Sequence, residues 1–219
     1  MTVKIKVCGV TRPEDAECAA ACGADFVGLN FYPPSPRCVA LDAAHRIARA
    51  DRGRALLVGV FVNASRAYVS ERLTAFQLDL LQFHGDEAEA DLAGWPVPVI
   101  RALRVPGDAA VEASDIANVR ANFVLIDTFH PRLFGGTGQA RSLAALRALD
   151  LSRVFVSGGL TPENAAEAAA LKPYALDVAS GVETAPGVKD RDLLRSFIAN
   201  ARSADEGPGR SQADAKLSR

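Results

Sequence analysis

The sequence predicts an α/β protein that folds as a single (β/α)8 barrel. Eight short runs of apolar, often β-branched residues alternate with segments of helical spacing. The runs begin about 20–30 residues apart, which is the length of one unit of strand, loop, helix and loop. Glycine and polar residues follow many of the runs, and a barrel collects all those strand ends on one face. A doubly wound open sheet, the alternative, would use mainly one crevice.

The first half of the chain supplies four predicted strands and four predicted helices. Near-continuous apolar runs are typical of strands buried on both faces, as in a parallel sheet. These strands are expected at 3–8 (VKIKVC), 25–30 (DFVGLN), 55–62 (ALLVGVFV) and 78–83 (LDLLQF). Apolar residues at helical spacing predict the helix after each strand, at 13–23, 41–51, 65–76 and 86–93.

The second half repeats the same order four more times. Strands are expected at 97–103 (VPVIRAL), 122–127 (NFVLID), 153–157 (RVFVS) and 175–180 (ALDVAS). Helices are expected at 108–119, 142–149, 162–171 and 190–201. Pro162 is expected at the first helical position of its segment, where its missing N–H is not needed.

Length and hydrophobicity favour one domain. A chain of 219 residues that is 49% hydrophobic can bury a large core, and β/α barrels of this size form single domains. The barrel is therefore expected to occupy residues 1–202. Beyond it the chain is polar and loses its periodicity, so residues 203–219 are expected to form a disordered tail.

Charge and apolar patterning exclude several kinds of partner. The 25 basic and 26 acidic residues give a formal charge of -1 without blocks of either sign, so no nucleic-acid partner is expected. The longest apolar run, at 55–62, is far too short to span a bilayer, and the first residues lack a leader's apolar region. We therefore expect a cytoplasmic protein without a membrane partner. The four cysteines lack the spacing of a disulfide framework or a zinc site.

Glycines after the last two predicted strands indicate a phosphate site. Gly158 and Gly159 follow the seventh strand, and Ser180 and Gly181 lie at the end of the eighth. Loops without Cβ atoms let backbone N–H groups close on an anion, and barrels use this position for phosphate. Gly136, in the cluster GGTG after the sixth strand, is a further candidate. The alternative is that these glycines form ordinary turns.

Four side chains at or just after strand ends are candidates for chemistry. Cys8 ends the first strand and Arg37 lies in the second loop. His84 follows the fourth strand and Asp127 ends the sixth. In a barrel all four would face one mouth. Each also has an ordinary role open to it: a packed thiol, a solvated surface charge, a hydrogen-bonded loop histidine and a turn cap.

An ordered set of short motifs resembles the phosphoribosylanthranilate isomerase family of tryptophan biosynthesis. The blocks run in order at the predicted strand ends from Lys4 to Ile198, and the set is far more specific than any one motif. They read KVCGVT, NFYPPSPR, VGVFVN, LQFHGDE, LIDTF, GGTG, SGGLTPENA and DVASGVETAPGVKD. The chain departs from the family in the first block, often KICG, and in the last, where Ala179 precedes Ser180 instead of a second serine.

The resemblance implies a TIM barrel and an Amadori rearrangement of N-(5'-phosphoribosyl)anthranilate. Family roles make Asp127 the general acid that protonates the furanose ring oxygen, and Cys8 the general base that takes the C2' proton. A thiol with a pKa of about 8.5 supplies thiolate near neutral pH, whereas Asp127 needs a raised pKa to stay protonated. Arg37 would grip the anthranilate carboxylate, and His84 would contact or position the substrate.

The implied chemistry requires no cofactor and no metal, because an iminium next to the reacting carbon already acidifies its proton. The expected partner is a small phosphorylated substrate, and a monomer and a homodimer both suit the composition. Two other functions stay open. One is another aminoaldose phosphate isomerase, which typically has a carboxylate where this chain has Cys8; the other is a barrel that binds a phosphorylated metabolite without catalysis.

Overall fold

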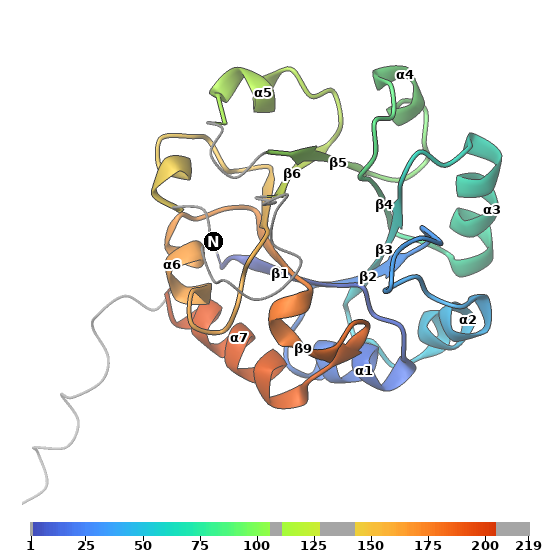
Figure 1. Cartoon of the computed structure of the whole chain (residues 1–219), viewed down its shortest axis with the longest axis horizontal. Helices are drawn as coiled ribbons and strands as arrows, with labels where there is room; N and C mark the ends of the chain where they lie inside the picture. Colours follow the sequence, from blue (N-terminus) through green and yellow to red (C-terminus); the bar gives the residue numbers. More distant parts are fainter. Residues whose placement is uncertain (1, 106–110, 128–142, 205–219) are drawn as a thin grey trace, which may run out of the picture.

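The computed structural model describes residues 2–105, 111–127 and 143–204, and in it eight parallel strands close into a barrel. The strands pair in chain order from β1 to β8, and β8 pairs with β1. Helices surround the ring of strands (Figure 1), and α1 (Pro13–Ala21) contacts α7 (Arg191–Ser203), so the two ends of the folded chain meet. The structure confirms the predicted (β/α)8 barrel.

Every predicted strand forms, with ends shifted by a few residues at most. The barrel strands are β1 (Lys4–Cys8), β2 (Phe26–Asn30), β3 (Leu56–Phe61), β4 (Leu80–Phe83), β5 (Val99–Arg104), β6 (Phe123–Asp127), β7 (Val154–Ser157) and β8 (Ala175–Val178). The eighth ends two residues before Ser180, which instead begins the 3-10 turn η2 (Ser180–Val182). A short hairpin of β9 (Glu183–Ala185) and β10 (Val188–Lys189) follows before α7.

Polar residues just before three strands cap the neighbouring strand. Asp25 Oδ2 accepts from the backbone N–H of Ile5, and Asp79 Oδ2 accepts from that of Leu57, both at 2.8 Å. Asn122 Oδ1 accepts likewise from Val99 at 2.9 Å. These contacts satisfy strand N–H groups at the amino-terminal end of the barrel. They also explain why β2, β4 and β6 begin after the polar residue and not at it.

The helices vary in length around the barrel. Besides α1 and α7 they are α2 (Leu41–Arg49), α3 (Arg66–Phe76), α4 (Glu89–Leu92), α5 (Ala113–Ala117) and α6 (Ala165–Ala170). The helix predicted over 142–149 is wrong for its described residues, which form only the 3-10 turn η1 (Leu143–Leu146). Leu143 and Leu146 of that turn are both buried, and a spacing of three suits a 3-10 turn.

Pro162 lies before its helix and not in it, so its predicted position is wrong. The side chain of Asn164 accepts a hydrogen bond from Thr161 N and donates to the Gly159 carbonyl, both at 2.9 Å. These bonds hold the chain in a turn, and α6 begins only at Ala165.

The core has two layers, as expected for a barrel whose strand residues alternate inward and outward. Outward residues pack against the helices in one large cluster. The inward residues fill the barrel in a separate cluster made of Phe26, Val58, Leu80, Ile100, Ala102, Leu125, Phe155 and Ala175. The part of the barrel interior that these residues fill is therefore closed by apolar packing and is not a channel. No helix within the described ranges has the length and apolar character to span a membrane.

The loop after β8 packs closely on the loop after β7, and we expect Gly181→Ala to destabilise the fold. A Cβ at Gly181 would overlap the carbonyl oxygen of Leu160 and press on Thr161. The backbone must move to admit it, at a cost of about 1–3 kcal/mol. Urea unfolding measures the loss. Ser180→Ala, at an exposed neighbouring side chain, is the control; equal stability of both variants would contradict this packing.

Candidate active site

The strand ends place the four predicted side chains around one mouth of the barrel. Cys8 ends β1, Asp127 ends β6 and His84 follows β4 directly. Arg37 lies in the loop between β2 and α2, where its backbone N–H donates to Ser35 Oγ at 3.1 Å. All four follow parallel strands of one closed barrel, so they share its carboxyl-terminal face, where barrel enzymes have their active sites.

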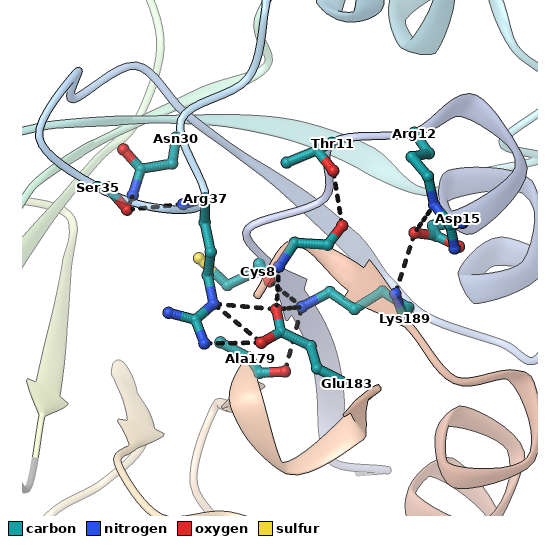
Figure 2. Close-up of polar contacts among 11 residues, drawn as sticks. Cys8, Thr11, Arg12, Asp15, Asn30, Ser35, Arg37, Ala179, Glu183 and Lys189 are labelled. Atoms are coloured by element: carbon teal, nitrogen blue, oxygen red, sulfur yellow. Dashed lines mark hydrogen bonds and ion pairs between the residues drawn. The ribbon is translucent and has the colours of Figure 1, made fainter. Parts of the chain in front are cut away.

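Arg37 is held by a carboxylate that the sequence did not reveal. Its Nε donates to both oxygens of Glu183, at 2.9 and 3.0 Å, and its Nη2 donates to Oε2 at 2.7 Å (Figure 2). This grip occupies one edge of the guanidinium. The other edge, made by Nη1 and the second N–H of Nη2, has no partner among the described residues, and it has the geometry to take a second carboxylate.

Lys189 joins this pair to Cys8. Its fully buried ammonium donates to the backbone carbonyls of Cys8 and Ala179, at 2.6 and 3.1 Å, and to Glu183 Oε1 at 2.7 Å (Figure 2). Burial lowers the pKa of Lys189, although Glu183 opposes the shift. Burial alone would raise the pKa of Glu183, but bonds from Arg37 and the charge of Lys189 outweigh it and lower the pKa. One ammonium thus ties together the end of β1, the loop after β8 and the partner of Arg37.

His84 and Asp127 contact each other on the other side of the mouth. His84 Nε2 lies 3.2 Å from Asp127 Oδ2. Gln82, buried inside the barrel on β4, places its Nε2 3.1 Å from His84 Nδ1. The amide N–H donates to Nδ1, so in the neutral ring Nε2 carries the proton and donates to Asp127. Gln82 thereby orients His84, and His84 orients Asp127.

The Cys8 thiol is free and partly buried. Burial raises its pKa, and the ammonium of Lys6 opposes this most strongly, while Lys189 opposes it more weakly. The pKa of the Cys8 thiol is therefore raised above the ordinary value expected from the sequence. Near neutral pH the thiol depends on positive neighbours to ionise.

The predicted phosphate glycines lie in two loops that touch each other. Gly158 and Gly159 follow β7 and both have left-handed backbone conformations, with φ of 89° and 64°. Gly181 lies in η2, against Leu160 of the first loop, and the neighbouring Ser180 is exposed. Gly136 lies outside the described residues.

The described residues form neither a group of metal ligands nor a disulfide. No three His, Cys, Asp or Glu side chains gather there as a group that could hold a metal ion. All four cysteines are free thiols.

Sequence reasoning missed five polar residues of the site. Three of them interrupt buried strands, and a polar residue in a fully apolar run is itself an indication of a specific partner. These are Lys6 in KIKVC, Gln82 in LLQF and Asp177 in ALDV. The other two, Glu183 and Lys189, lie in a hairpin that no periodicity predicts.

The fold and the mouth define a β/α-barrel enzyme. A family model described as "N-(5'phosphoribosyl)anthranilate (PRA) isomerase" matches residues 5–200. The N-(5'-phosphoribosyl)anthranilate isomerase of Pseudomonas fluorescens strain Pf-5 is 44% identical over 205 residues, which cover 93% of this chain and 98% of that protein. The chain therefore belongs to the N-(5'-phosphoribosyl)anthranilate isomerase family.

Solved structures of that family match the whole barrel. The crystal structure of phosphoribosyl anthranilate isomerase from Thermus thermophilus superposes with a TM-score of 0.81 at 37% identity, over 92% of this chain and 99% of that one. A second isomerase, solved in complex with reduced 1-(o-carboxyphenylamino)-1-deoxyribulose 5-phosphate, has a TM-score of 0.76 at 34% identity, over 92% and 100% of the two chains. The resemblance seen in the motifs is thus confirmed for family and fold.

We expect Glu183→Gln to destabilise the protein by about 3–5 kcal/mol, because it leaves the buried Lys189 ammonium without its counter-charge. Chemical unfolding measures the change. The double variant Glu183→Gln/Lys189→Met should lose less than the sum of the two single losses. Asp192→Asn, in an exposed pair with Arg195, is the control and should change stability very little. Additive losses in the double variant would contradict the coupling.

Proposed function

We propose that the protein catalyses the Amadori rearrangement of N-(5'-phosphoribosyl)anthranilate to 1-(2-carboxyphenylamino)-1-deoxyribulose 5-phosphate, with Asp127 as general acid and Cys8 as general base. The observation that carries this proposal is a thiol at the end of β1 and a carboxylate at the end of β6, around the mouth of one barrel. Membership of the isomerase family supports the substrate and the reaction.

Asp127 suits the acid role by its position. His84 occupies Oδ2, while Oδ1 has no partner among the described residues and is available to the ring oxygen of a substrate. Protonation of that oxygen breaks its bond to C1' and leaves an iminium between C1' and the anthranilate nitrogen. The iminium acidifies the C2' proton.

Cys8 then takes the C2' proton as a thiolate. The electrons of the C2'–H bond move to form the enolamine, and return of a proton to C1' with loss of the 2'-hydroxyl proton gives the ketone. No atom is gained or lost. A partly buried thiolate close to Lys6 and Lys189 suits a base that must act away from bulk water.

The two ends of the substrate have matching groups at the mouth. Arg37 offers the unused edge of its guanidinium to the anthranilate carboxylate, while Glu183 holds the other edge still. The loops with Gly158, Gly159, Ser180 and Gly181 would take the phosphate through backbone N–H groups, with Gly136 as a further candidate. The ribose would then lie between Cys8 and Asp127.

Cellular setting and assembly are part of the same proposal. A biosynthetic enzyme that acts on a phosphorylated small molecule fits the cytoplasm, and the charge pattern gives no reason for a nucleic-acid or membrane partner. One solved relative, from Thermotoga maritima, is described as monomers of a dimeric phosphoribosylanthranilate isomerase. A monomer and a homodimer are both compatible with the barrel described here, and sedimentation equilibrium separates them.

The reaction is tested through the fluorescence of the anthranilate group. Phosphoribosylanthranilate is generated in situ, the purified protein is added with a chelator present, and the loss of fluorescence is followed. We expect rapid turnover by the wild type and a loss of at least about 100-fold in kcat for Cys8→Ser and for Asp127→Asn, because each removes a proton-transfer group. Circular dichroism should show that both variants fold.

Cys38→Ser is the matched control, since it exchanges another partly buried free thiol and should keep full activity. Absence of turnover by the folded wild type would contradict the proposal and favour another phosphosugar substrate. Equal phosphate-ligand binding by wild type and Cys8→Ala, with no turnover by either, would favour a barrel that only binds its ligand.

A further inference from the structure

A buried ion pair lies inside the barrel, beneath the mouth, and the acid and base chemistry above does not use it. Lys6 of β1 is 0% exposed and Asp177 of β8 is 5% exposed, and Lys6 Nζ lies 2.9 Å from Asp177 Oδ1. The pairing of β1 with β8 sets these two residues opposite each other. Removing two charges from water is costly, and apolar residues often serve stability equally well at such positions. Stability alone does not account for the pair.

The Lys6 ammonium and the Cys8 thiol border the same small space. Both side chains point into the barrel, because they alternate with outward residues along β1. A Cβ built on Gly28, the residue paired with Cys8 on β2, would stand 3.1 Å from Cys8 Sγ and 3.2 Å from Lys6 Nζ. Glycine therefore leaves open the space that the sulfur and the ammonium both border, which any larger residue would fill.

The charges around the thiol come from four elements. Lys6 on β1, Asp177 on β8, Lys189 on β10 and Arg37 after β2 all interact with it electrostatically. Lys189 and Arg37 share Glu183 as counter-ion, which reduces their effect on the sulfur. Lys6 has the strongest favourable effect on the ionised thiol.

Lys6 keeps its charge in spite of its burial. Burial alone would lower the pKa of Lys6, but the negative charges of Asp177 and of ionised Cys8 outweigh it and raise the pKa. Asp177 thus favours the charged form of Lys6 in the barrel interior, while burial raises the pKa of Asp177 itself and Lys6 opposes that shift.

We propose that Lys6, held by Asp177, is a positioning residue whose ammonium stabilises the thiolate of Cys8. The role in turnover rests on the proposed isomerase function, whereas the coupling between ammonium and thiolate does not. Asp177 has the opposite electrostatic effect on the thiolate, since it is a negative charge close by, and its contribution is to hold the ammonium in place.

The test is a titration of the Cys8 thiolate by its ultraviolet absorbance, without substrate, in a chain carrying Cys18→Ala, Cys22→Ala and Cys38→Ala. In Lys6→Met the titration should move to higher pH by about one unit or more, because the stabilising cation is gone. In Asp177→Asn the titration should move less than in Lys6→Met, because the loss of a repelling carboxylate offsets the loss of the group that holds the ammonium. Lys6→Arg should restore most of the wild-type behaviour. A pair that only supports the fold would leave the thiol titration of the folded variants unchanged.

Activity gives a second readout. The rising limb of kcat/KM against pH should move with the thiolate, to higher pH in Lys6→Met, because thiolate is the active form and a raised pKa lowers its fraction. KM should change little. If Lys6→Met does not fold, the double variant Lys6→Met/Asp177→Asn, which has a neutral pair, replaces it. The Cys8 thiol of this variant should still ionise at a higher pH than that of the wild type.

The titration result and the turnover result can be told apart, so this inference and the proposed function can fail independently. An unchanged thiol titration in folded Lys6→Met or in the neutral pair would overturn this inference even if the wild type turns over phosphoribosylanthranilate. A shifted titration with no turnover by the wild type would overturn the proposed function and leave the coupling of Lys6 to Cys8 supported.

Discussion

The pairing of β1 with β8 is the contact on which the rest of the structure depends. It closes the barrel and brings the first strand, with its thiol, beside the last unit of the chain. Two buried cations follow from it: Lys6 meets Asp177 inside the barrel, and Lys189 reaches the carbonyl of Cys8 from β10. An open sheet would leave Lys6 and Asp177 at opposite edges without their counter-charges, and it would take the Lys189 ammonium away from the Cys8 carbonyl.

Closure of the barrel also gives the mouth two sides that carry different charged and hydrogen-bonding groups. The side formed by β1, β2 and the hairpin after β8 carries positive charge near the sulfur, which favours a thiolate. The side formed by β4 and β6 holds a carboxylate against a histidine whose tautomer is set by Gln82. Asp177 is near enough to both sides to interact with Lys6, His84 and Asp127, so the two halves share one electrostatic environment.

The fold was largely predictable from the sequence because strand and helix periods are local properties. The eight runs, the strand ends at Cys8 and Asp127 and the loop glycines after β7 needed no tertiary information. Two helix predictions were wrong. The side-chain bonds of Asn164 delay the start of α6, and residues 143–146 form a 3-10 turn in place of an α-helix. For the site, the motifs identified candidate residues, but the contact of Glu183 with Arg37 and that of Lys189 with Cys8 depend on closure of the barrel and cannot be seen in a linear pattern.

The most direct test of this account is a crystal structure of the protein with a stable, reduced analogue of the carboxyphenylamino-deoxyribulose phosphate product. We expect the carboxylate on the free edge of Arg37, the phosphate at the glycine loops after β7 and β8, and C2 of the sugar in contact with Cys8 Sγ. Asp127 should lie beside the hydroxyl whose oxygen belonged to the furanose ring. An analogue that binds with its sugar carbons away from Cys8, or with its carboxylate away from Arg37, would contradict the roles given to these two residues.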